Sequence, residues 1–249
     1  MLWNRSGLRF RGCGLWYLAA ACALSAPAAL GSPVAWVSDQ NGNRLTGDSV
    51  FGDCVPAPDP SLVAYCLSPT TLSGVKSVLN GFVAYDPVTG FLTYSYEATN
   101  YGAGPLMYNL SFTAVFQPDY YFAADATLSG SGVAGRGTIA PPNGGGIAVI
   151  QGGSPSWQLS IGTTVCDPAV GPSCYYDPVS LTLPPSVFDS VLVNVSFVVP
   201  GIGSAAGTPD QGNDLGVNGS LSLDPVPEPA GAGLAAAGLI ALAFLRRRL

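Results

Sequence analysis

The chain alternates apolar and polar side chains along the stretch Leu106-Met107-Tyr108-Asn109-Leu110-Ser111-Phe112-Thr113-Ala114-Val115-Phe116. Every even-numbered residue of this stretch is apolar, whereas Asn109, Ser111 and Thr113 fall between them. Successive side chains of a β-strand point to opposite faces, so a period of two predicts a strand with one face on a core and the other in water.

Three further stretches repeat this alternation. Their apolar positions are Leu92, Tyr94, Tyr96 and Ala98; Trp157, Leu159, Ile161, Thr163 and Val165; and Val191, Val193, Val195, Phe197 and Val199. Between residues 32 and 224 the sequence has no amphipathic helical pattern. Short strands separated by Gly, Pro, Asn and Asp predict an all-β fold, either an antiparallel β-sandwich or a jelly roll.

Turn residues give two local predictions. Asn80-Gly81 stands between two apolar runs, and a two-residue hairpin turn favours this pair because it requires positive φ. Asp86-Pro87-Val88-Thr89-Gly90 predicts a second turn just before the strand at Leu92. The order of the strands within the sheets does not follow from these signals.

Composition excludes several functions. The chain contains no histidine, which excludes a Ser-His-Asp hydrolase, a Cys-His protease and a His-ligated metal enzyme within this chain. Apart from the arginines near the two ends, its cations are Arg44, Lys76 and Arg136; these three against fifteen carboxylates leave 3 − 15 = −12. Nucleic acid, which binds through Lys and Arg, is therefore not expected as a partner.

The N-terminal segment, residues 1–31, has the order of features of a secretory signal peptide. Arg5, Arg9 and Arg11 precede an apolar run from Gly14 to Leu24, and small residues then offer cleavage after Ala28 or Gly31. An uncleaved membrane anchor is the alternative. The apolar run is short for that role, because spanning a bilayer takes about 20 residues. We expect a signal helix that is removed on export.

The C-terminal segment, residues 225–249, has three ordered elements. A prolyl stretch is followed by an uncharged run from Ala230 to Leu245, which as a helix measures about 24 Å, somewhat short of a ~30 Å hydrocarbon core. Three arginines close the chain and favour the cytoplasmic side. The positions concerned are Pro227, Glu228 and Pro229, and then Arg246, Arg247 and Arg248.

This C-terminal segment resembles the PEP-CTERM sorting signal of Gram-negative bacteria. The resemblance covers about a tenth of the chain and lies in Val226-Pro227-Glu228-Pro229, in the short apolar helix with Gly238-Leu239, and in the final arginines. It implies recognition by an exosortase, a membrane enzyme thought to cut near the Pro-Glu-Pro motif. It also implies export together with exopolysaccharide, often in biofilm-forming species. A plain tail anchor is the alternative.

Four cysteines remain after removal of the signal peptide. Cys54 and Cys66 are twelve residues apart, and Cys166 and Cys174 are eight apart, both pairs in stretches expected to be proline-rich loops. Four cysteines permit three pairings, of which we favour the two local ones, Cys54–Cys66 and Cys166–Cys174. Each would close a small loop and stabilise the fold by roughly 3 kcal/mol on the chain-entropy model. Metal ligation is not expected from this spacing.

Two other motifs are weak. Gly130-Ser131-Gly132-Val133-Ala134-Gly135 matches a dinucleotide-binding pattern, but the residues that follow cannot form the helix this motif requires, so we interpret it as a loop between strands. The oxygen-bearing residues Asp210, Asn213, Asp214 and Asn218 stand in a Gly-rich stretch. Their spacing does not match an EF-hand. A solvated loop is our interpretation, with a calcium site as the alternative.

Candidate residues for polysaccharide chemistry are few. A glycosidase needs two carboxylates across the sugar, and Glu97 is the one glutamate between the two terminal segments, beside thirteen aspartates of which no pair stands out. Exposed aromatic rings could instead stack on a saccharide, with packing in the core as the alternative for each of them. The rings predicted near turns are Tyr101, Tyr120, Tyr121, Tyr175 and Tyr176.

Together these features predict three parts: a signal peptide over 1–31, an extracellular β-domain over 32–224, and a sorting tail over 225–249. We expect a non-enzymatic surface or matrix protein without a cofactor. Its expected partners are an exosortase, the membrane through the tail helix before processing, and an exopolysaccharide. The alternative is a secreted polysaccharide-acting enzyme that uses Asp carboxylates.

The basic, apolar and small-residue order of the N-terminal segment yields a test. N-terminal sequencing of protein recovered from the producing bacterium should start at Ala29 or Ser32, because export would remove the preceding residues. A mature protein that still begins at Met1 would contradict the signal-peptide prediction.

Overall fold

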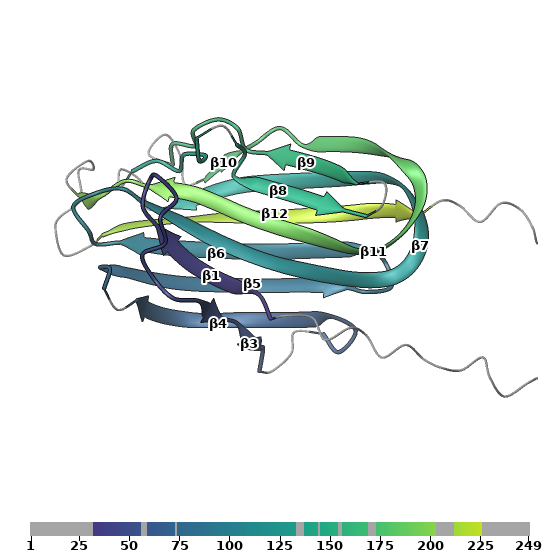
Figure 1. Ribbon diagram of the computed structural model, residues 1–249, viewed down its shortest axis with the longest axis horizontal. Coiled ribbons are helices and arrows are strands. Elements are labelled where there is room, and N and C mark those ends of the chain that lie inside the picture. Colours follow the sequence, from purple (N-terminus) through teal and green to yellow (C-terminus); the bar gives the residue numbers. More distant parts are fainter. Residues whose placement is uncertain are drawn as a thin grey trace, which may run out of the picture. The chain divides into compact units, whose positions relative to one another are not determined.

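The computed structural model describes residues 32–55, 59–72, 74–132, 137–143, 145–153, 156–168, 173–202 and 212–225. Within these ranges the chain forms twelve β-strands and no α-helix, so the all-β prediction is confirmed (Figure 1). No helix of the described part has the length and hydropathy needed to cross a membrane. The predicted signal peptide, the Pro227-Glu228-Pro229 motif and the final arginines lie outside the described residues.

The strands alternate with short connections along the chain. Their bounds are β1 Val34–Ser38, β2 Ser49–Val50, β3 Gly52–Asp53, β4 Val63–Leu72, β5 Ser77–Asp86, β6 Phe91–Asn100, β7 Leu106–Gly132, β8 Ala148–Gly152, β9 Trp157–Ile161, β10 Ser173–Tyr175, β11 Val179–Val199 and β12 Asn213–Pro225. All pairings between them are antiparallel. β7 and β11 are much longer than the rest, and this difference determines the architecture.

The strands form two layers that share β7 and β11. The first layer runs β3-β4-β5-β6-β12 and then the second half of β7. It ends with β10 and the start of β11, which both pair with the other edge of β7. The second layer runs β2-β1, the first half of β7, the second half of β11, β8 and β9. Because β7 and β11 run through both layers, the hydrogen-bonded path is continuous although the sheet is folded on itself.

β7 and β11 bend together at one end of the domain. In Figure 1 both curve round on the right-hand side. Their register shifts between Thr182 and Ser186 and again between Phe188 and Ser190. Pro118 stands opposite this region in β7 and Pro184-Pro185 lies within it in β11. Proline has no N–H to donate to the ladder, so these residues suit the place where pairing is interrupted and the strands turn into the other layer.

Aromatic rings from the two layers meet in the core. Tyr94 of β6 lies edge-on to Phe112 of β7 at 6.0 Å between ring centroids, and Tyr96 of β6 contacts Phe197 of β11 at 5.6 Å. The Tyr96 hydroxyl donates to the backbone oxygen of Asn109 across the layers at 3.1 Å. Edge-to-face pairs contribute about 0.5–1.5 kcal/mol beyond burial. These contacts show that the two layers pack face to face as a sandwich.

The predicted inward faces are largely confirmed. Leu92, Tyr94, Tyr96 and Ala98 are buried, as are the odd-numbered residues from Val191 to Val199. The ladder that begins at Trp157 was predicted too long. Its strand β9 ends at Ile161, Gly162 adopts a positive φ of 76°, and Val165 is 58% exposed. Val165 therefore contributes nothing to the core, although its position fits the alternation.

The hairpin predicted at Asn80-Gly81 is wrong. Both residues lie within the continuous strand β5, and the connection to β4 precedes Ser77. The reason for a glycine at this position is packing: a Cβ on Gly81 would lie 2.6 Å from Cζ of the buried Phe51 ring.

The turn predicted at residues 86–90 is confirmed, with Gly90 at φ 72° and the Asp86 carboxylate accepting from the Val88 N–H at 2.8 Å.

Both favoured disulfides are present, Cys54–Cys66 and Cys166–Cys174. Their placement differs from the predicted loops, because Cys66 lies in β4 and Cys174 in β10. The first joins the short β3 region to its neighbour β4. The second joins the segment before β10 to β10 itself. Each disulfide therefore secures short strands or connections that have few backbone hydrogen bonds of their own.

The contact between Gly81 and Phe51 predicts the effect of one methyl group. Gly81→Ala should lower the free energy of unfolding by about 1–3 kcal/mol, because the added Cβ overpacks a buried ring. Denaturant unfolding followed by circular dichroism measures this difference. Gly52→Ala in β3 is the matched control, because nothing lies within 4 Å of its added Cβ. Equal unfolding midpoints for the two variants would refute the packing role.

Candidate functional site

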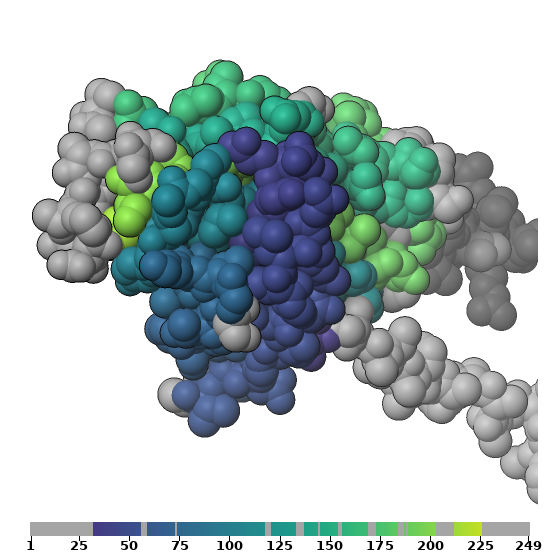
Figure 2. All heavy atoms as spheres, turned by 60° about the vertical axis from the view of Figure 1, so that its left-hand side comes forward, coloured from purple at the N-terminus to yellow at the C-terminus, as the bar shows by residue number. Residues whose placement is uncertain are grey.

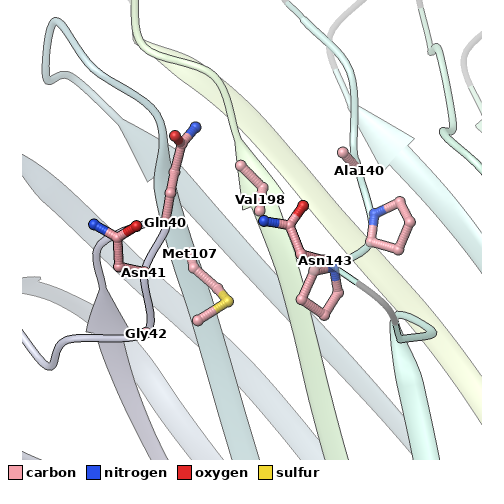
Figure 3. Close-up of a pocket in the computed structure, with 9 residues that line it drawn as sticks. Gln40, Asn41, Gly42, Met107, Ala140, Asn143 and Val198 are labelled. Atoms are coloured by element: carbon pink, nitrogen blue, oxygen red, sulfur yellow. The ribbon is translucent and has the colours of Figure 1, made fainter.

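A groove of about 610 Å³ lies on the outer face of the second layer. Met107 of β7 and Val198 of β11 are directly paired and lie between its two walls. Figure 3 shows Gln40 and Asn41 on one side of these residues and Asn143 on the other. Strand alternation explains the position of Met107 and Val198: their neighbours Tyr108 and Phe197 point into the core, so they point outward.

The first wall is a tight turn built on Asp39. Its carboxylate accepts hydrogen bonds from the Asn41 N–H at 2.9 Å, the Asn43 N–H at 2.8 Å and the Asn43 side-chain amide at 2.8 Å. Gly42 supplies the positive φ of 83° that the turn requires. The Asn43 side-chain amide is the main cause that lowers the pKa of Asp39. The ionised carboxylate thus holds the turn that presents Gln40 and Asn41 to the groove.

This turn belongs to the stretch from β1 to β2, residues 34–50, which runs along the surface in purple in Figure 2. Its base is secured to β1 by the Leu45 N–H, which donates to the Val37 backbone oxygen at 2.9 Å. Just beyond the turn, the Arg44 guanidinium lies over the Trp36 ring at 4.6 Å from the centroid and pairs with Asp48. The charge of Arg44 is thereby paired within the same segment.

The second wall runs from Ala140 to Asn143. Ala140 exchanges backbone hydrogen bonds with Val198 at 3.2 and 2.8 Å, and Ile139 does so with Cys166 at 2.8 Å in both directions. Cys166 is in turn bonded to Cys174. A chain of covalent and backbone bonds therefore fixes this wall beside β11. Pro141 and Pro142 follow Ala140, and their rings add apolar, conformationally restricted surface.

The described residues that line the groove are all uncharged. The side-chain amides of Gln40, Asn41 and Asn143 each offer both donors and an acceptor. Met107, Val198 and the two prolines offer apolar contact. Such a combination suits a neutral ligand that carries several hydroxyl groups and has apolar C–H faces. It offers no carboxylate, imidazole or thiol to perform acid–base or nucleophilic chemistry.

The tyrosines predicted as saccharide contacts lie elsewhere. Tyr121 is buried at the bend of β7, and its hydroxyl donates to the Gln117 backbone oxygen at 3.3 Å. Tyr101 and Tyr176 are half-buried, and the structure does not describe the side chain of Tyr120. Tyr175 is 82% exposed, but it lies on β10 opposite Ser129, in the first layer. No tyrosine is among the described residues that line the groove.

Glu97 also lies away from the groove. It is exposed on β6, on the outer face of the first layer, where the Asn80 amide donates to it at 3.3 Å. Asp214 of the neighbouring strand β12 accepts from the Thr99 hydroxyl at 3.3 Å. These carboxylates therefore lie on the opposite side of the sandwich from the groove.

The stretch predicted as a solvated loop or calcium site is a strand. Asn213, Asp214 and Asn218 belong to β12, and Asp210 lies outside the described residues. Asn213 is buried and donates to the Pro200 backbone oxygen at 2.7 Å, whereas Asn218 is exposed. Their side chains thus lie on opposite faces of the sheet. Across the described part of the chain, no three His, Cys, Asp or Glu residues are grouped to hold a metal ion.

The glycine-rich motif is not simply a loop either. Gly130, Ser131 and Gly132 form the end of β7 and pair with β12 and β10. A Cβ on Gly130 would overlap the Cys166 sulfur and lie 3.1 Å from Ile139 Cδ1. Glycine at this position therefore makes room for the disulfide that secures the second wall of the groove.

Sequence reasoning did not find the groove. Its described residues come from four separated segments, around Asn41, Met107, Pro142 and Val198. They are brought together by the pairing of β1 with β7, of β7 with β11, and of Ala140 with Val198. One local signal was present: Asp39-Gln40-Asn41-Gly42-Asn43 has the composition of a tight turn.

Comparisons with known proteins do not assign this chain to a family. No family model matches the sequence, and no curated protein matches it. Among solved structures, the carbohydrate-binding module TmCBM61 in complex with β-1,4-galactotriose is 8% identical with a TM-score of 0.28, over 68% of this chain and 85% of that one.

Two further solved structures are similarly distant. A domain of bacteriophage CBA120 tailspike protein 4 is 12% identical with a TM-score of 0.28, over 77% of this chain and 19% of that one. A β-1,3-glucan-binding module from Bacillus halodurans is 14% identical with a TM-score of 0.25, over 56% and 90%. At such low TM-scores these likenesses support no inference about this chain.

Proposed function

We propose that this chain is a non-catalytic, exported protein that binds a neutral polysaccharide in the groove between the Asp39 turn and the Pro141-Pro142 segment. The observation that carries the proposal is the lining of that groove, with its amide side chains over an apolar base and its lack of charge among the described residues. Amides form hydrogen bonds with hydroxyl groups as donor and as acceptor, and apolar side chains contact the C–H faces of a sugar ring.

Binding accounts for this groove better than catalysis. Glycoside hydrolysis uses an acid and a second carboxylate on opposite sides of the scissile bond. The carboxylate nearest in sequence to the groove residues, Asp39, is occupied by three hydrogen bonds within its own turn. Its lowered pKa keeps it ionised and makes it a poor proton donor.

We further propose that an exosortase-type system sorts the protein to the cell surface or extracellular matrix of a Gram-negative bacterium, where exopolysaccharide is its partner. Two observations support this route. The C-terminal segment has the ordered elements of a PEP-CTERM signal. The β-domain contains two disulfides, which are typical of proteins exported to an oxidising compartment.

The groove proposal predicts a loss of binding. Asn41→Ala and Asn143→Ala should each weaken binding of the producing bacterium's purified neutral exopolysaccharide by about tenfold, because each removes hydrogen bonds worth roughly 1 kcal/mol or more. Affinity electrophoresis or calorimetry measures the change. Asn80→Ala, on the outer face of the first layer, is the matched control and should bind like the wild type. Wild-type affinity in both groove variants would overturn the proposal.

The sorting proposal predicts a defect in processing. In the producing bacterium, Glu228→Gln should leave export intact but prevent release or surface placement, because the apolar run and the arginines remain. Intact mass and cell fractionation report both steps. Deletion of residues 226–249 is the reference for complete loss of sorting. If Glu228→Gln is processed and located like the wild type, residues 230–245 act as a plain anchor instead.

A further inference from the structure

We infer that the binding surface continues from the groove along β7 and β11 to a second hollow on the same face, so that the protein binds an internal stretch of an extended neutral chain rather than a single sugar. This inference rests on the proposed function and specifies its ligand. It predicts affinity that depends on chain length.

The second hollow measures about 480 Å³ and lies at the other end of the face. Thr113 of β7 and Leu192 of β11 are directly paired and both line it. Gln151 of β8 and Gln158 of β9 line it as well, and the Gln151 amide donates to the Gln158 side-chain oxygen at 2.8 Å. Its chemistry therefore repeats that of the groove: amide and hydroxyl groups beside apolar surface, with no charge in its described lining.

Strand geometry places the two sites on one face. Met107 and Thr113 are six residues apart on β7, as are Val198 and Leu192 on β11, and an even separation keeps side chains on the same side of a strand. At about 3.4 Å per residue, the centres of the two sites are about 20 Å apart. A single sugar ring is much shorter than this, whereas an extended oligosaccharide can reach both.

Polar side chains occupy the outward positions of β7 and β11 between the two sites, and Ser111, Asn194 and Ser196 among them are partly exposed. Two directly paired couples lie between them, Asn109 with Ser196 and Ser111 with Asn194. Asn109 is only 5% exposed and is held by both neighbouring strands: its amide donates to Ser38 Oγ at 2.8 Å and its oxygen accepts from Ser196 Oγ at 2.8 Å. Ser111 and Asn194 are half-buried and offer hydroxyl and amide groups midway along the face.

The charge of the protein favours a neutral polysaccharide over an acidic one. The described outward positions of β7, β11, β8 and β9 between the two hollows carry no ionisable side chain. Without the terminal segments' arginines, the chain's formal charge is −12, which repels polyanions at long range. The Arg44 guanidinium, which lies over Trp36 beside Asn109, is paired with Asp48, so it does not offset that repulsion for an acidic polysaccharide. The surface therefore fits an uncharged chain.

The test uses neutral oligosaccharides of graded length, released by partial acid hydrolysis from the producing bacterium's exopolysaccharide. For the wild type, calorimetry should show affinity that rises with length until the oligosaccharide spans about 20 Å and then levels off. The double variant Gln151→Ala/Gln158→Ala removes both partners of the amide pair and leaves no orphaned group there. It should reduce affinity for long oligosaccharides about tenfold and leave short ones unchanged.

The groove variant Asn41→Ala should instead weaken binding at every length, and Asn80→Ala should change nothing. Thermal unfolding of all variants checks that the fold is retained. If affinity does not depend on length, or if the double variant binds long oligosaccharides like the wild type, the extended surface is refuted while the groove stands. If Asn41→Ala also binds every length like the wild type, or no oligosaccharide binds at all, the proposed function fails as well.

Discussion

The pairing of β7 with β11 is the constraint on which the rest of this structure depends. The two strands stay antiparallel partners on both sides of a bend, so they form one ladder in each layer. Four other strands pair directly with one of their halves: β12 and β10 with the second half of β7, β1 with its first half, and β8 with the second half of β11. The remaining strands attach to these four, directly or through one another. The bend decides which of these strands face one another across the core.

The same two strands couple the core to the proposed binding face. On β7, Tyr108 points inward and forms a 2.8 Å hydrogen bond with the Ser77 hydroxyl, while Met107 points outward into the groove. On β11, Phe197 packs against Tyr96 while Val198 lines the groove. A one-residue shift in register would exchange these faces. The buried aromatic contacts therefore also determine which side chains are offered to a ligand.

The sequence predicted the strands better than their arrangement. Alternation identified the buried faces of β6, β7 and β11 because solvent and core impose a period of two on each strand separately. The bend and the layer order arise from pairing between distant residues, which no local pattern records. Asn80-Gly81 shows the limit of local reasoning: its turn preference is real, but the Phe51 ring requires the glycine for space inside a strand.

The disulfides were predictable because short sequence separation favoured local pairing. The groove was not, because its walls and base come from segments up to about 160 residues apart.

The place of β12 has a consequence for the timing of folding. This strand, which ends at Pro225, lies between β6 and β7 in the first layer. Its contacts close very long loops, as in the hydrogen bond from Thr93 to Gly219 across 126 residues of sequence. Until β12 arrives, β6 and β7 both present unpaired edges, and such non-local pairing is slow. A chain that emerges N-terminus first therefore cannot complete its central sheet until nearly all of it is available. The β-domain therefore completes its fold only after its last strand is available, however early its first strands have formed.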